Sequence, residues 1–258
     1  MDICVVSSGS SGNATYVRFA NTAVLIDGGI SLKELARRMA TAGLRAEDID
    51  AVLVSHGHND HVRGVPVICR RLGIPVYANR ATLAETGLAA SVGGAGAVDF
   101  VTGEEFELGD LRIRPFPVPH DAAEPVGFVI SHRGARACLA TDLGSVTMEV
   151  VRAFTGCDAV VLESNHDEAM LFEGPYPEFL KRRVAGPNGH LSNEDAAGLL
   201  RGVAHGGLRH IVMAHLSRTN NTPGLSLEAA ERALGARCGA TEIHLARQDR
   251  AGALLTVG

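Results

Sequence analysis

This sequence of 258 residues lacks several features of membrane and secreted proteins. No apolar run approaches the roughly 18 residues that suggest a membrane span. The N-terminus has no basic segment followed by a long apolar one, as a secretory signal would have. The five cysteines are scattered and form no C-x-x-C pair, so reduced thiols are expected. These absences predict a cytoplasmic protein with no membrane association.

The sequence also lacks tryptophan and an excess of positive charge. It has 24 Lys and Arg against 29 Asp and Glu, a formal net charge of -5. Broad electrostatic binding of nucleic acid needs the opposite balance, although a local basic patch remains compatible with it. There is no internal repeat, low-complexity segment or Pro/Ser-rich linker. We therefore expect one domain over residues 1–258, with a substantial hydrophobic core.

Apolar periodicity predicts many short strands with helices between them. Strands are expected at residues 3–6, 15–19, 23–26, 51–54, 74–78, 98–101, 105–108, 111–118, 126–131, 136–141, 159–162, 210–214, 241–246 and 252–257. Helices are expected at residues 32–42, 65–72, 81–89, 147–154, 194–204 and 227–234. The strands between residues 98 and 141 have the pattern of a meander. Such a chain predicts an α/β fold with sheets covered by helices.

The stretch SHGHNDH at residues 55–61 places His56, His58, Asp60 and His61 directly after a buried strand. Imidazole and carboxylate are the ligands that zinc and similar divalent metals prefer. A tight turn can direct alternate side chains to one point and their neighbours to a second. A surface turn that happens to be rich in histidine is the alternative, but so many ligand types in so short a segment favour a metal site.

Three further candidate ligands occupy similar positions in the sequence. His120, Asp142 and His215 each lie just past the end of a strand-like run. If those strands share an orientation, the side chains meet at one edge of the sheets, where sites are commonly built. Together with the first cluster they complete a two-metal set. It comprises three histidines for one ion, Asp-His-His for the other, and a bridging carboxylate.

The order H-x-H-x-D-H, His, Asp, His resembles the metallo-β-lactamase superfamily over essentially the whole chain, as does LIDGG at residues 25–29. Ser55 departs mildly from the family, which often has Thr there. The resemblance implies a four-layer αββα sandwich, with two mixed sheets back to back and helices outside. It implies one metal ion on His56, His58 and His120, a second on Asp60, His61 and His215, and Asp142 between them. Zinc, manganese and iron all accept these ligands.

Four other stretches resemble the YycJ-like branch of that superfamily, also called WalJ-like. They are SSGSSGN at residues 7–13, ESNHD at 163–167, GHLSN at 189–193 and HLSRTNN at 215–221. The resemblance implies exonuclease activity on double-stranded DNA, with DNA ends as the substrate and cleavage from the 5′ end.

His190 follows a glycine in PNGH, a flexible approach suited to presenting a side chain. We expect His190 to contact the phosphate and protonate the leaving group, and Asp60 to orient a nucleophile that two metal ions activate. The run at residues 181–183 is either a solvated helix face or a contact to the phosphate backbone. Ser192 has the position of a helix N-cap. The remaining histidines are expected to be structural: His132, His205, His210 and His244.

Four residues are predicted to contact substrate: His166, Ser217, Asn220 and Asn221. Three of them have an alternative interpretation. His166 is otherwise a surface side chain, and Asn220 and Asn221 otherwise belong to a turn.

Other functions use the same ligands. A small cyclic phosphodiesterase or an RNA-processing hydrolase is the nearest alternative. GHLSN and ESNHD argue against thioester hydrolysis, and the lack of a signal together with Asp142 argues against a secreted β-lactamase. A non-catalytic metal-binding regulatory protein would not need all seven ligand positions filled. The sequence leaves the oligomeric state open.

Overall fold

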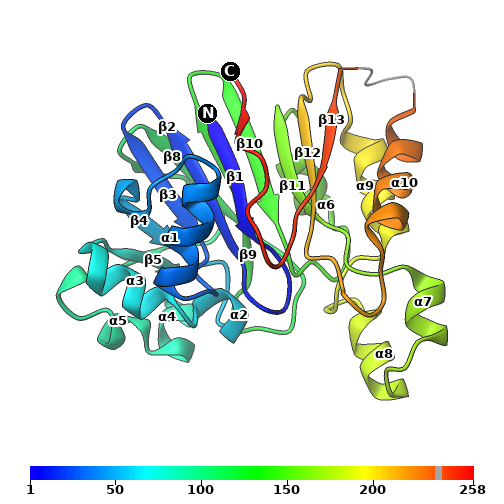
Figure 1. The fold of residues 1–258 in the computed structure, drawn as a ribbon, viewed down its shortest axis with the longest axis horizontal. Helices are drawn as coiled ribbons and strands as arrows, with labels where there is room; N and C mark the ends of the chain where they lie inside the picture. The colour runs from blue at the N-terminus through cyan, green and yellow to red at the C-terminus, as the bar shows by residue number, and fades with distance from the viewer. Residues whose placement is uncertain (236–239) are drawn as a thin grey trace.

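The computed structural model describes residues 1–235 and 240–258, which form two facing β-sheets with helices outside each (Figure 1). This is the αββα sandwich that the sequence predicts. The cysteines within the described residues are free, namely Cys4, Cys69, Cys138 and Cys157. Cys238, also predicted to be reduced, lies outside the described residues. No helix within the described ranges is long and apolar enough to cross a membrane.

The first sheet has the strand order β14-β1-β2-β3-β4-β5-β6. Its strands are β1 (Asp2–Ser7), β2 (Ala14–Phe19), β3 (Thr22–Ile26), β4 (Ala51–Leu53), β5 (Val76–Asn79), β6 (Ala97–Phe100) and β14 (Leu255–Thr256). β14, β1, β2 and β3 pair antiparallel, whereas β3 to β6 pair parallel.

The second sheet has the order β13-β12-β11-β10-β9-β8-β7. Its strands are β7 (Phe106–Leu108), β8 (Leu111–Pro117), β9 (Val126–His132), β10 (Ala135–Ala140), β11 (Ala159–Glu163), β12 (His210–Ala214) and β13 (Glu242–Leu245). β7 to β10 form an antiparallel meander, and β10 to β13 are parallel. The prediction that the meander begins at residue 98 is wrong. A helical connection makes β6 a parallel neighbour of β5 in the first sheet.

The helices are α1 (Leu32–Thr41), α2 (Asn59–Val62), α3 (Val65–Leu72), α4 (Arg80–Thr86), α5 (Leu88–Ser91), α6 (Met148–Phe154), α7 (Glu168–Glu173), α8 (Glu178–Val184), α9 (Asn193–Val203) and α10 (Pro223–Leu234), with short 3-10 turns η1 (Ala46–Asp48) and η2 (Gly93–Ala95). The helix predicted over residues 81–89 is divided at Gly87, which has a left-handed φ of 64° and ends α4. α10 begins earlier than expected because the Thr222 hydroxyl accepts from the amide of Leu225 and caps it. Ser192 caps α9 as predicted.

Three apolar layers hold the sandwich together. Side chains from both sheets form the middle layer, including Val24, Leu53, Phe128 and Val161. One outer layer packs α1 and α3 on the first sheet, and the other packs α6, α9 and α10 on the second. Organisation as one domain over residues 1–258 stays a prediction, which the shared middle layer supports.

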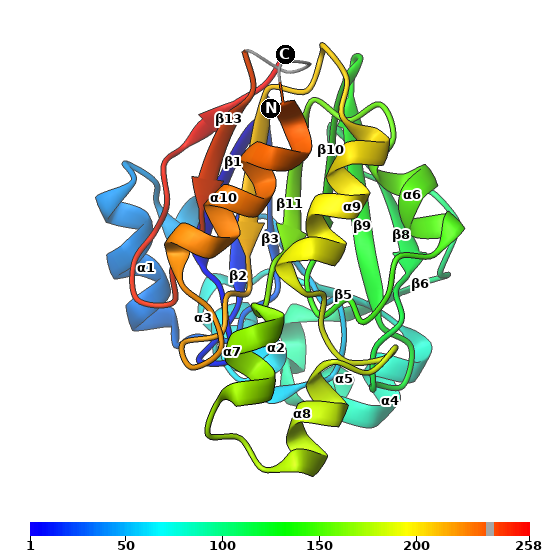
Figure 2. The same cartoon turned by 90° about the vertical axis from the view of Figure 1, so that its right-hand side faces the viewer.

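The carboxyl ends of the strands that precede the predicted ligands meet at one edge, as the sequence argument required. β8, β10, β11 and β12 run in the same direction in the second sheet. α7 and α8 project beyond the second sheet at this edge, at the same end of the molecule as α2 (Figure 2). Asp27, Asp142 and His215 each follow a strand with a left-handed φ, of 61°, 57° and 56°. Such strain in residues other than glycine is typical of functional sites.

Candidate metal centre

His56, His58 and His120 form a first cluster, called here the three-histidine group. Their ligand nitrogens lie within 4.8 Å of one another, and His120 Nε2 is 3.3 Å from His58 Nδ1. His56 Nε2 is buried and has no hydrogen-bond partner. Burial, with His61 close by, holds the pKa of His56 well below its usual range. A neutral imidazole with a free buried nitrogen is the form that binds a divalent metal.

Asp60, His61, Asp142 and His215 form a second cluster, called here the acidic group. His61 Nε2 is 3.1 Å from Asp142 Oδ2, and His215 Nε2 is 3.8 Å from Asp60 Oδ2. His215 Nε2 is buried without a hydrogen-bond partner. These buried nitrogens facing carboxylates fit a second divalent ion.

Asp142 lies between the two groups. Its Oδ1 is 3.7 Å from His120 Nε2 in the three-histidine group and 3.7 Å from His215 Nε2 in the acidic group. Burial alone would raise the pKa of Asp142, but the neighbouring His215 and His61 outweigh it and hold the pKa well below its usual range. The side chain is therefore a carboxylate placed to reach both groups.

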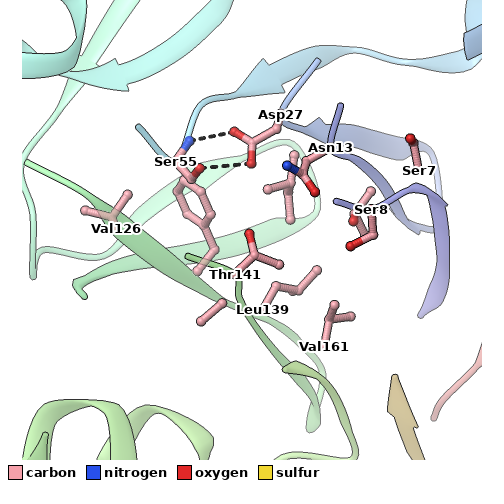
Figure 3. Close-up of a pocket in the computed structure, with 13 residues that line it drawn as sticks. Ser7, Ser8, Asn13, Asp27, Ser55, Val126, Leu139, Thr141 and Val161 are labelled. Carbon is pink, nitrogen blue, oxygen red and sulfur yellow. Dashed lines mark hydrogen bonds between the residues drawn. The ribbon is translucent and has the colours of Figure 1, made fainter. Parts of the chain in front are cut away.

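Asp27 supports the acidic group from behind, a role that the sequence argument did not assign. Its Oδ2 accepts from His61 Nδ1 at 2.8 Å and from the Ser55 hydroxyl at 2.9 Å, and its Oδ1 accepts from the Ser55 amide at 2.8 Å. Figure 3 shows Asp27, Ser55 and Asn13 around a small cavity of about 30 Å³ between the sheets, with Leu139 and Val161 among its apolar lining. The hydrogen bond to Nδ1 leaves Nε2 of His61 facing the cluster, as is usual for a metal-binding histidine.

Glu163 is the second buried carboxylate that the sequence argument missed. Its Oε1 accepts from His190 Nδ1 at 2.9 Å and from His215 Nδ1 at 2.7 Å. Burial alone would raise the pKa of Glu163, but His190 and His215 outweigh it and lower the pKa to about 2. Glu163 is the last residue of β11, and Asp142 and His215 follow the ends of β10 and β12. The search for ligand-type residues at strand ends that found Asp142 and His215 could therefore also have found Glu163.

The turn at residues 7–13 reaches the same place from the first sheet. Asn13 Nδ2 lies 2.9 Å from His61 Nε2 and 3.3 Å from Asp60 Oδ2. The Ser8 hydroxyl accepts from the backbone amide of His215 at 2.8 Å. Small polar residues are needed in this turn because it packs directly against the acidic group.

A cleft of about 300 Å³ opens onto both groups. Its walls include His58, Asp60, His120, Asp142, Arg183, His190 and His215. Burial alone would lower the pKa of His190, but the neighbouring carboxylate of Glu163 outweighs burial and raises the pKa. Arg183 on α8 forms an ion pair with Asp121 at 2.7 Å. The cleft therefore places two hydrogen-bond donors, His190 and Arg183, beside the clustered ligands.

The four predicted substrate contacts lie outside this cleft. Asn221 Nδ2 donates to the carbonyls of Ser164 and Asn165 and to Asn193 Oδ1, so its amide ties α9 to the β11 end. Asn220 and His166 are buried, which excludes the alternative of a surface position for His166. Ser217 lines a neighbouring cleft of about 330 Å³. Direct substrate contact by Asn220, Asn221 and His166 stays a prediction that their burial disfavours.

Of the remaining histidines, His132 stacks on Phe19 with ring centroids 3.9 Å apart, and His205 Nε2 lies 3.0 Å from the carbonyl of Cys157. Both fit the structural roles expected of them. His210 and His244 face each other on neighbouring strands.

The arrangement of the layers is that of a metallo-β-lactamase fold. The metallo-β-lactamase fold protein YhfI from Bacillus subtilis superposes with a TM-score of 0.74 at 15% sequence identity, covering 97% of this chain and 98% of that one. The chain belongs to the β-lactamase superfamily, whose domain model, described as "Beta-lactamase superfamily domain", matches residues 22–215.

Two curated relatives match along most of their length. The chain is 36% identical over 231 residues to the exodeoxyribonuclease YycJ of Bacillus anthracis, covering 89% of this chain and 88% of that protein. It is 33% identical over 225 residues to the exodeoxyribonuclease WalJ of Streptococcus pneumoniae D39, covering 86% and 84%. These relatives bear out the predicted YycJ-like resemblance.

Proposed function

We propose that the protein is a metal-dependent hydrolase of phosphodiester bonds that degrades double-stranded DNA from its 5′ end. The observation that carries the proposal is the position of His190 in the cleft beside both ligand groups, in a chain related to exodeoxyribonucleases. The three-histidine group would hold one divalent ion, and Asp60, His61 and His215 the other, with Asp142 between them. Zinc suits these ligands best, and manganese and iron also fit them.

Two bound ions would activate water and offset the charge of a phosphoryl oxygen. Asp60 is less buried than His61, Asp142 and His215, so its carboxylate can orient the attacking water. Glu163 occupies Nδ1 of His190, so Nε2 remains to donate a hydrogen bond to the phosphate and a proton to the leaving oxygen. Glu163 fixes the ring and favours its protonated form, as a proton donor requires.

A path for the nucleic acid backbone leads from the cleft in two directions. Arg183 stands on the α8 side. On the other side, the cleft lined by Ser217, Arg218 and Arg247 begins at Ser8, which hydrogen-bonds the amide of His215. Two local cationic positions in a chain of net charge -5 favour salt-sensitive binding at a DNA terminus over coating of a duplex.

The proposed location is the cytoplasm. The free cysteines of the described residues support it, because unpaired thiols are usual in a reducing compartment.

The test uses purified protein with added Zn²⁺ or Mn²⁺ and duplexes labelled at the 5′ or the 3′ end. Early release of the 5′ label, with a covalently closed circle untouched, supports the proposal. Equal cutting of the circle contradicts an exonuclease. Inertness on DNA with turnover of RNA or cyclic nucleotides would assign the site to another phosphodiester.

A further inference from the structure

A separate cluster of ligand side chains lies far from the cleft, at the opposite end of the second sheet. His210 begins β12, while Glu242 and His244 lie on the edge strand β13. The parallel register pairs His210 with Glu242 and Val212 with His244. Because side chains two residues apart share a face of a strand, all three project from the same face. Figure 1 shows the starts of β12 and β13 near the chain termini, away from α7 and α8.

The three ligand atoms form a nearly equilateral triangle. Glu242 Oε2 is 3.5 Å from His210 Nδ1 and 3.5 Å from His244 Nε2, and the two nitrogens are 3.3 Å apart. Ligands at about 2.0–2.1 Å from a tetrahedral zinc ion are separated by about 3.3–3.4 Å. The contacts are long for hydrogen bonds, which are usually about 2.7–3.2 Å for N–H···O. The spacing therefore fits a shared ion better than it fits direct pairing.

The other nitrogen of His210 supports the same interpretation. Its Nε2 faces the carbonyl of Thr256 on β14 at 3.4 Å, which is also long for a hydrogen bond. This orientation of the ring directs Nδ1 at Glu242 and His244. A carbonyl behind a histidine is common among metal ligands. In the catalytic cleft, His120 shows the same arrangement, with Nδ1 on the carbonyl of Gly189 and Nε2 in the three-histidine group.

We propose that His210, Glu242 and His244 bind one divalent ion of the zinc class, with water completing the coordination. The side chains are accessible, with 67% of Glu242 and 26% of His244 exposed. An ion there would join the edge strand β13 to β12 and so stabilise the end of the sheet. This site would be independent of the cleft and of the reaction proposed there.

The test separates this site from the catalytic centre. In a His56→Ala/Asp142→Ala background, zinc is added, loosely bound metal is removed by dialysis, and the metal per chain is measured. One retained ion is expected. Adding His244→Ala should remove it. Adding Glu242→Gln should weaken zinc binding by about tenfold or more, because loss of a residue that only supports a ligand already costs about that much affinity. Glu107→Gln is the matched control, since Glu107 is an exposed carboxylate on β7, the other edge strand of the same sheet.

Zinc should also raise the melting temperature of the background protein, and this rise should vanish with His244→Ala. Should the background fail to fold, the otherwise unaltered chain serves: His244→Ala should lower its zinc content by one ion while nuclease activity is retained. Equal zinc retention with and without His244 overturns the proposal, as does a background protein that retains no zinc.

Discussion

The three-histidine group and the acidic group differ in what stands behind their imidazoles. In the acidic group, buried carboxylates hold both histidines, with Asp27 on His61 and Glu163 on His215. In the three-histidine group two of the partners are neutral, because the carbonyl of Gly189 lies on His120 and the Ser55 hydroxyl lies 3.0 Å from His56 Nδ1. Within the described residues, the only carboxylate behind this group is that of Asp121, which is partly exposed and lies 3.9 Å from His58 Nε2. A carboxylate behind an imidazole raises the basicity of the ligand.

This contrast indicates an unequal pair of metal positions. The acidic group has more negative charge within and behind it and should hold its ion more tightly. The three-histidine group includes His58, whose side chain is 32% exposed, and it opens to the cleft. We therefore expect the ion of the three-histidine group to be the first removed by a chelator. In the His244→Ala variant, which lacks the ion proposed on β12 and β13, metal content measured against chelator concentration should fall in two steps, from two ions to one and then to none.

Replacing the residue that both groups share should have the largest effect. Asp142→Ala should abolish activity and loosen both ions, because the buried carboxylate reaches His120, His61 and His215. Asp142→Asn should also fail, since a neutral amide offsets less positive charge. Metal analysis and turnover of labelled duplex check this. Near-normal turnover in either variant, with the fold confirmed by circular dichroism, would contradict a bridging role.

Removing His190 should affect chemistry and leave both groups loaded. His190→Ala should retain both ions of the cleft and lower kcat by roughly two to four orders of magnitude, the usual contribution of a general acid. Single-turnover kinetics and metal analysis measure the two effects separately. Loss of one ion in this variant would make His190 a ligand instead.

Asp27→Asn should act mainly on the acidic group, because Asp27 contacts His61 directly and His56 only through the Ser55 hydroxyl. The amide cannot accept from His61 Nδ1 with the strength of a carboxylate, so the affinity of that position should fall by about 10–100-fold. Titration against a chelator measures this loss. Asp99→Asn is the matched control, because Asp99 is a carboxylate on the same sheet that pairs with Arg80 at the surface. An equal loss at both metal positions would remove the distinction between the groups.

The smallest expected effect is that of Arg183→Ala. Arg183 lines the cleft, so its loss should raise KM a few-fold and reduce the dependence of binding on log salt by about one unit, with kcat little changed. Arg182 on the same helix pairs with Glu178 at 3.3 Å and lies outside the cleft, so Arg182→Ala is the control. Identical salt dependence in the two variants would exclude Arg183 from the DNA path.

The sequence by itself identified the seven candidate ligands that the structure brings together in two clusters, and its resemblance to the superfamily predicted the layers. Imidazoles and carboxylates stand directly after apolar strands, and the strand ends of parallel segments must share an edge. Local patterns also predicted the N-cap of α9 at Ser192. They failed for α7, which is a short helix with no long apolar period, and for the sheet to which β6 belongs.

Only the tertiary structure decided which polar residues serve the site and which hold the fold. Glu163 and Asp27 were visible as acids near strand ends, yet their roles depend on which histidine each faces across the layers. Asn221 and His166 have the residue types of substrate contacts, but both are buried and hydrogen-bonded to Asn193 at the start of α9. The register of β12 and β13 brings His210 and His244 together from positions 34 residues apart. Hydrogen bonds and charge interactions depend on the distance between two groups in space. The sequence pattern predicts that distance only for residues within one helix or strand.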